Sequence, residues 1–164
     1  YQENEYNDEG QVIGLKTTPY SYALDGLWVG DMPQTAYVMG ATLTPIKGLR
    51  LQGILKMYDK NYSDWSPNAR EYDGSDADAD RSQVWQAPKY NRLDLHGSYK
   101  LPKIGGLDMS INAHIFNALD AVYVQDAVDN SQYNGYGDKL HLPHNAEVFL
   151  GTPRYANIGL VVNF

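Results

Sequence analysis

"RLDLHGSYKLPKIGGLDMSINAHIF", residues 92 to 116, alternates apolar and polar side chains on both sides of a short central segment. Successive side chains of a strand point to opposite faces, so this alternation predicts two strands that lie between unlike environments. The Pro and Gly residues of "PKIGG" between the two halves are typical of a tight turn. The stretch therefore predicts an antiparallel β-hairpin with one apolar and one polar face.

Both faces of this hairpin stay chemically uniform if Leu101 faces Leu107 across the turn. The same pattern occurs upstream, where "QTAYVMGATL" and "LRLQGILKMY" flank the turn "TPIKG". There the matching register places Leu43 opposite Leu49. We therefore expect two hairpins of the same kind, in these two registers.

The C-terminal stretch "PRYANIGLVVNF" also alternates, with one wholly apolar side, and predicts a fifth strand. Tight turns join the strands within each hairpin, whereas the connections at about 61–89 and 117–152 are long and polar. Short turns at one end and long loops at the other are typical of outer-membrane β-barrels. Aromatic residues near the long loops predict an interfacial girdle: Tyr58, Tyr62, Trp65, Trp85, Tyr90, Phe116, Tyr123 and Tyr155.

Composition excludes several classes of protein. The 164 residues carry a net charge of -7, and the 13 basic residues are scattered, which argues against nucleic acid as a partner. The absence of cysteine excludes disulfides and thiolate metal sites. No run of about 18 apolar residues predicts a transmembrane helix, but a transmembrane strand needs only about 10 alternating residues.

The division of the chain follows from these strands. We expect residues 1–33 to be mostly an extracellular loop with some strand, and residues 34–164 to be the C-terminal strands of a barrel. The fold class is thus all-β, an antiparallel transmembrane β-barrel of which this chain supplies the last five or six strands. Five strands cannot close, because the smallest bacterial barrels have about eight. The polar start "YQENEYNDEG" lacks an initiator Met, so we expect a fragment or a processed product.

Three stretches together resemble the C-terminal end of TonB-dependent outer-membrane receptors: "YNRLDLHGSYKL", "INAHIFNALDAVYVQDAVDN" and "GTPRYANIGLVVNF". The family's penultimate strand commonly ends in an Asn-Leu-Phe-Asp-like box followed by Tyr. Its last strand commonly begins with Gly-x-Pro-Arg and ends in Phe. The matching residues here are Phe116, Asn117, Ala118, Leu119, Asp120 and Tyr123, then Gly151, Pro153, Arg154 and Phe164. The phrase "DAVDNSQYNGY" is similar to members from Bacteroidota-like bacteria.

This resemblance implies a 22-stranded barrel around a plug, in the outer membrane of a Gram-negative bacterium, that takes up a nutrient with energy relayed by TonB. The implied partners are outer-membrane lipid, the rest of the barrel and its plug, TonB through an N-terminal part, the barrel-assembly machinery and a surface lipoprotein. The resemblance makes Phe164 the signal that the assembly machinery recognises. We expect no catalytic activity and no cofactor other than calcium.

Calcium is indicated by "DGSDADADRS", which places Asp76, Asp78 and Asp80 at alternate positions. Carboxylates at the first, third and fifth positions of a loop can converge on one hard cation. The sixth position is Arg81 where a calcium loop has Gly, and the twelfth is Ala87 where it has Glu. A solvated acidic loop is the alternative.

Two weaker patterns involve histidine. Asp94, His96 and Ser98, facing His114 on the next strand, have the residue types of a hydrolase triad, with a polar lumen wall as the alternative. His141 and His144 have a spacing compatible with one zinc ion, with an ordered loop as the alternative.

Aromatic residues of the long loops are the candidates for ligand contact: Trp65, Trp85, Tyr133 and Tyr136. They also support a second hypothesis for the whole chain. A soluble or surface β-sandwich that binds carbohydrate would use the same Trp and Tyr residues.

Overall fold

The long sheet is the main feature of the computed structural model, which describes residues 2–17, 19, 21–72, 75, 77, 79–103, 105–135 and 137–163. The expectation of an all-β chain with antiparallel sheets is confirmed, and the helices of the described residues are single 3-10 turns. The five strands of the long sheet are β4 (Thr35–Leu43), β5 (Leu49–Asp59), β9 (Tyr90–Lys100), β10 (Asp108–Phe116) and β13 (Tyr155–Asn163).

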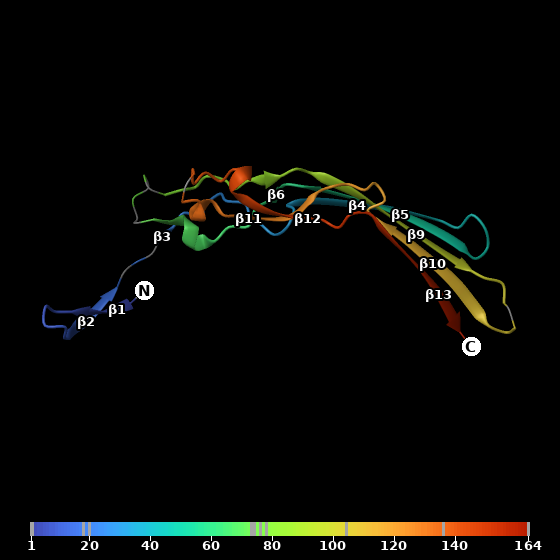
Figure 1. Cartoon of the computed structure of the whole chain (residues 1–164), viewed down its shortest axis with the longest axis horizontal. Coiled ribbons are helices and arrows are strands. Elements are labelled where there is room, and N and C mark those ends of the chain that lie inside the picture. The colour runs from blue at the N-terminus through green and yellow to red at the C-terminus, as the bar shows by residue number, and fades with distance from the viewer. Residues whose placement is uncertain are drawn as a thin grey trace.

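These five strands form an antiparallel meander in the order β13-β10-β9-β5-β4. The turns that join β4 to β5 and β9 to β10 lie at one end of the sheet, together with the C-terminal end of β13 (Figure 1). The long connections lie at the other end. The sheet does not close on itself, because β4 and β13 are its two edges.

The rest of the chain forms short pairs of strands at the loop end. These pairs are β1 (Gln2–Tyr6) with β2 (Val12–Thr17), β3 (Ser21–Tyr22) with β7 (Glu71–Tyr72), β6 (Asn61–Tyr62) with β8 (Gln86–Ala87), and β11 (Val124–Asp129) with β12 (Ala146–Leu150). The 3-10 turns are η1 (Pro67–Arg70), η2 (Ser131–Tyr133) and η3 (Pro143–Asn145). Residues 1–33 thus contain β1, β2 and β3, and the hairpin of β1 and β2 stands away from the long sheet (Figure 1).

The predicted registers of both hairpins are wrong by two residues. Leu43 pairs with Leu51, where Leu49 was expected, and Lys100 pairs with Ser110. Each turn is longer than the simple pairing assumed, because glycines with positive φ, such as Gly48 at 88°, build a turn of their own at the tip. A shift of two residues leaves every side chain on its expected face, since side chains alternate with a period of two.

The two faces of the sheet differ as the alternation predicts. Large apolar side chains on one face are exposed on every strand: Tyr37, Met39, Leu43, Leu51, Leu95, Ile115, Ile158 and Leu160. We call this side of the five strands the apolar face. The opposite side, the polar face, carries side chains such as Lys56, Asp94 and His114, with Val38 as an apolar exception.

Four of the eight aromatic residues predicted to form the interfacial girdle lie on the long sheet, and all four are on its polar face. Tyr58 pairs with Tyr90, and their rings are tilted by 36° with centroids 5.0 Å apart, whereas Phe116 and Tyr155 stack at 4.7 Å. The strand pairing puts all four side chains on the same side of the sheet as Lys56 and Asp94, which is the polar face. Position along the strand was predicted well, but side-chain parity puts these rings opposite the apolar face.

The buried apolar residues of the described chain lie in the loop layer, outside the long sheet. They are Ala23, Tyr62, Val84, Ala87, Tyr123 and Ala127. The short strands therefore build a small core among the loops. The long sheet is a single layer whose apolar face nothing in the described residues covers.

Candidate functional site

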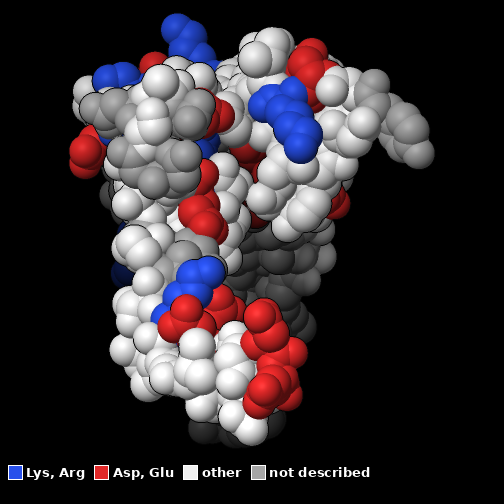
Figure 2. Space-filling view, turned by 90° about the vertical axis from the view of Figure 1, so that its left-hand side faces the viewer, with Lys and Arg blue, Asp and Glu red and all other residues white. Residues whose placement is uncertain are grey.

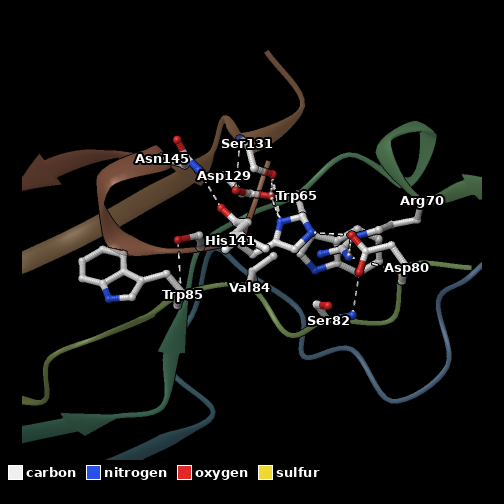
Figure 3. A network of polar contacts seen from close by, with 12 residues as sticks. Trp65, Arg70, Asp80, Ser82, Val84, Trp85, Asp129, Ser131, His141 and Asn145 are labelled. Carbon is white, nitrogen blue, oxygen red and sulfur yellow. Dashed lines mark hydrogen bonds and ion pairs between the residues drawn. The ribbon is translucent and has the colours of Figure 1, made fainter. Parts of the chain in front are cut away.

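A cluster of polar and charged side chains joins the two long connections, the one between β5 and β9 and the one between β10 and β13. His141 lies between two carboxylates, with Nδ1 at 2.6 Å from Oδ2 of Asp129 and Nε2 at 2.8 Å from Oδ2 of Asp80. Ser131 Oγ donates to the same Asp129 oxygen at 2.9 Å. Arg70 completes this loop cluster through an ion pair of 3.2 Å between its Nη1 and Asp80 Oδ2 (Figure 3).

The loop cluster is largely buried. Arg70 is 1% exposed and its guanidinium lies 5.9 Å above the ring of Trp65. Burial lowers the pKa of Arg70, while the negative charges of Asp80 and Asp129 oppose that change. Arg70 and His141 thus both contact the Asp80 carboxylate in the loop layer.

Asp80 keeps its charge well into acid. Burial raises the pKa of its carboxyl, but hydrogen bonds with His141 and Ser82 and the charge of Arg70 outweigh burial and lower that pKa from 3.8 to about 2. Asp80 and His141 are 61 residues apart in sequence, so this contact ties the connection that leaves β5 to the one that leaves β10. The loop cluster therefore fixes two long loops against each other.

Ser131, His141 and Asp80 have the residue types and contacts of a hydrolase triad, with Ser131 Oγ 2.9 Å from Nδ1 of His141, but Asp129 Oδ2 lies closer to the same Nδ1, at 2.6 Å. His141 bonds both carboxylates only with an N–H on each ring nitrogen, because a neutral imidazole has a single N–H. A ring with two N–H groups has no lone pair with which to take the Ser131 proton. The geometry therefore fits a structural tie between loops.

The aromatic candidates for ligand contact do not lie in one place. Trp65 donates its Nε1–H to the carbonyl oxygen of Trp28 at 2.9 Å, and Trp85 accepts a backbone bond from Ser63 through its own carbonyl. Tyr133 is 75% exposed and lines a separate groove. Tyr136 lies outside the described residues, and the ligand role of all four stays a prediction.

Of the three predicted calcium ligands, only Asp80 is among the described residues, because Asp76 and Asp78 lie outside them. The Asp80 carboxylate is already bonded by Arg70 and His141. Elsewhere in the loops, Asp64 raises the pKa of Asp31 by charge repulsion, with burial and Asp126 adding to the effect. Across the described chain, no three His, Asp or Glu side chains are placed to hold a metal together, and calcium stays a prediction.

The polar face of the sheet carries a second set of charged groups. Lys56 Nζ lies 2.8 Å from Asp94 Oδ2, and Asp94 Oδ1 accepts the backbone N–H of Asn117 at 3.0 Å. Arg92 lies 3.8 Å from Asp94 and donates to the hydroxyl of Tyr123 at 3.1 Å. Lys56 and Arg92 therefore both form ion pairs with the Asp94 carboxylate on this face.

Histidines occupy the next position along the polar face. His96 and His114 are direct cross-strand partners, and their Nδ1 atoms lie 2.8 Å apart. The triad predicted from Asp94, His96 and Ser98 is not assembled, because His96 bonds His114 and Asp94 bonds Lys56. A pocket of about 460 Å³ opens over this pair.

The residues behind the family resemblance form a compact joint after β10. Asn117 is fully buried at φ 49°, its Nδ2 donates to the carbonyl oxygens of Ala121 and Thr152, and its Oδ1 accepts the N–H of Ala121. Asp120 Oδ1 accepts the backbone N–H of Arg154 at 3.0 Å. This joint connects the end of β10 to the start of β13, which accounts for a polar box at that position.

No family model matches the chain, and neither does any curated protein or solved structure. Nowhere in the described part of the chain does a helix have the length and apolar character that crossing a bilayer requires.

Zinc binding by His141 and His144 finds no support in their contacts, because His141 bonds Asp80 and Asp129 while His144 bonds Asp138 at 3.1 Å.

Sequence reasoning missed the loop cluster. Arg70, Asp129 and Ser131 stand in stretches without a recognisable motif, and their partners lie far along the chain. Spacing within one stretch cannot reveal a pair separated by 61 residues.

Proposed function

We propose that this chain is the C-terminal segment of an outer-membrane β-barrel transporter that resembles the TonB-dependent receptors. It spans the membrane with the five strands of the long sheet and takes part in active uptake of a nutrient. The single observation that carries the proposal is the exposed apolar face, which extends over all five strands.

An apolar sheet face in water is costly, and a domain normally buries it against a second layer. Ile158 is 77% exposed and Leu160 is 62% exposed on β13, and Met39 is 54% exposed on β4, at the opposite edge of the sheet. A bilayer removes this cost, because lipid chains take the place of the second layer.

The polar face supports the same arrangement. Buried ions such as Asp94 with Lys56 are tolerated on the lumen side of a barrel, where water and polar groups are available, and are costly on the lipid side.

The two open edges support a larger barrel. Unpaired N–H and C=O groups on β4 and β13 cannot remain in hydrocarbon, so further strands must pair with both edges.

The unequal ends of the sheet set the orientation. Turns of outer-membrane barrels are short on the periplasmic side and long outside the cell. The loop cluster and the short strand pairs then form the extracellular surface, where Trp65, Trp85 and Tyr133 are available to ligand. Acidic side chains cover more of this end than basic ones (Figure 2), which does not favour nucleic acid as a partner.

The remaining partners follow from the resemblance. The polar face would contact the plug, TonB would act through an N-terminal part, and a surface lipoprotein would cover the loops. Phe164, which lies outside the described residues, would serve the barrel-assembly machinery. Deleting Phe164 should then lower the outer-membrane level of the protein several-fold without changing the heat resistance of inserted protein.

The carbohydrate-binding sandwich finds less support. A sandwich packs a second sheet on the apolar face of the first at about 10 Å. Exposure of Leu43 at 65% and Leu160 at 62% shows the two edges of that face uncovered in the described residues.

Fractionation of cells that produce the full-length protein tests the proposal. We expect the protein in the outer-membrane fraction, released by detergent but not by alkaline carbonate, and migrating faster on gels before heating than after. A protein that stays in the soluble fraction and melts cooperatively without detergent would favour the sandwich.

A further inference from the structure

We infer that His96 and His114 form a binding site for a divalent transition-metal ion, of the type Zn²⁺ or Cu²⁺, on the polar face of the long sheet. The inference rests on the geometry of β9 and β10 and holds for any surroundings of the sheet. If the polar face lines a barrel, the ion lies in its lumen.

The two rings are already directed at a common point. His96 and His114 face each other across neighbouring strands, with ring centroids 5.0 Å apart and Nδ1 atoms 2.8 Å apart. At that separation one Nδ1–H donates to the lone pair of the other. A metal ion would replace the shared proton and accept both lone pairs, as imidazole nitrogen does in zinc and copper sites.

The distances fit a metal after a small movement. Zinc–imidazole bonds are about 2.0–2.1 Å long, so two nitrogens at a tetrahedral angle lie about 3.3 Å apart. The observed 2.8 Å must therefore increase by only about half an ångström. Rotation of the two half-buried rings is sufficient, and the backbone pairing of the strands can stay unchanged.

The surroundings leave room for further ligands. The pocket of about 460 Å³ over the pair is also lined by Arg50, Gln52, Ser98 and Asn112. Gln52 pairs with His96 on the side away from His114, which brings an amide oxygen into the same row of the sheet. The protein thus offers two strong ligands and leaves the other positions to water, an amide or an added anion.

The charges near the pair decide what completes the coordination. Asp94, the nearest carboxylate along β9, is held by Lys56 and Asn117 and is not available as a third ligand. Arg50 lines the pocket and repels a bare cation, so a metal ion together with an anionic ligand is favoured. The rings of Phe116 and His96 lie edge to face with centroids 5.5 Å apart, so Phe116 limits the rotation of His96 on the loop side.

The four histidines of the chain allow a sharp test. Untagged full-length protein in detergent is titrated with Zn²⁺ in competition with a chromophoric chelator, and with Cu²⁺ followed by EPR. His96→Gln and His114→Gln should each weaken binding by at least about tenfold, since loss of even an outer-shell partner costs about 10–100-fold. His144→Gln, at an exposed side chain, is the matched control and should bind as the unchanged protein does.

The Cu²⁺ spectrum keeps the test valid if a His96 or His114 variant does not fold. In the His144→Gln protein, which removes the alternative pair with His141, the spectrum should still show two bound imidazole nitrogens. Loss of that signal in His144→Gln, or equal affinity in the unchanged protein and the folded His96→Gln variant, would overturn the inference. Absence of saturable binding to the unchanged protein would overturn it as well.

Discussion

Nζ of Lys56 lies 2.8 Å from Oδ2 of Asp94, a residue only 1% exposed on a sheet that is one layer thick. The pair joins β5 to β9, and the bond from Asn117 to the same carboxylate adds the end of β10. All of these charges lie on the polar face, opposite Leu93 and Leu95. The sheet therefore separates a charged side from an apolar side across a single thickness of backbone.

Removing this carboxylate should destabilise the sheet. Asp94→Ala leaves Lys56 and the Asn117 N–H without their acceptor, so the free energy of unfolding should fall by about 3 kcal/mol. Asp108→Ala is the control, because its ion pairs are with the exposed Lys100 at 3.5 Å and Lys103 at 3.1 Å and contribute little. Urea unfolding of the detergent-solubilised protein measures both variants, and equal losses would contradict the assigned role of Asp94.

Substitutions of Asn117 should lower the free energy of unfolding, both through lost hydrogen bonds and through strain at its positive φ. Asn117→Ala loses the bonds to Ala121 and Thr152 and places a Cβ at φ 49° without a compensating side-chain bond. We expect a loss of about 3 kcal/mol for Ala. Asn117→Gly should lose about 1 kcal/mol less, since glycine tolerates positive φ. Unfolding curves in which Gly is the worse substitution would argue against the geometry of this joint.

Acid should release the loop cluster through Asp80. Its pKa is lowered from 3.8 in the unfolded chain to about 2 in the folded protein, so the carboxylate stabilises the fold above about pH 3.8. That contribution is lost as the pH falls from about 3.8 to about 2. Asp80→Asn should therefore lower the melting temperature of the loops at pH 5, and this effect should shrink as the pH falls through about 2. A difference between the two proteins that is independent of pH would contradict the ion-pair assignment.

Arginine substitutions on adjacent residues of β13 compare the two faces. Ile158→Arg puts a charge on the apolar face and should cost about 2–4 kcal/mol near the middle of a bilayer. Asn157→Arg, one residue away, lies on the polar face beside His114 and should cost clearly less. Folding titrations into lipid vesicles give both values, and similar costs would refute the assignment of the faces.

The five long strands were predictable because alternation with a period of two directly encodes which side chains share a face. The register was not, because a shift of two residues leaves the alternation of Leu93, Leu95 and Gly97 intact. The same alternation could have predicted that the side chains of Tyr58 and Tyr90 lie on the polar face. Their clustering near the loops resembles a girdle, but their positions in the alternation place them on the polar face.

The loop layer was much less predictable. Its short strands contain few apolar residues, so β6 and β8 have no periodic signal in sequence. The pairing of Asp80 with His141 depends on a long-range fold of two connections, and the stretch around Asp80 read as a metal loop. The local motif around Asp80 could not reveal that Arg70 and His141 both bond this carboxylate.

Residue-by-residue exposure to lipid along β13 tests the central claim most directly. The chain has no cysteine, so single cysteines at positions 156 to 162 carry one spin label each without other changes. In lipid vesicles, collision with oxygen should be high at Ala156, Ile158, Leu160 and Val162, and collision with a polar nickel reagent should be high at Asn157, Gly159 and Val161. This two-residue alternation, with the even positions exposed to lipid, is the result predicted by a membrane-spanning sheet. Equal access of the polar reagent to both sets of positions would contradict it.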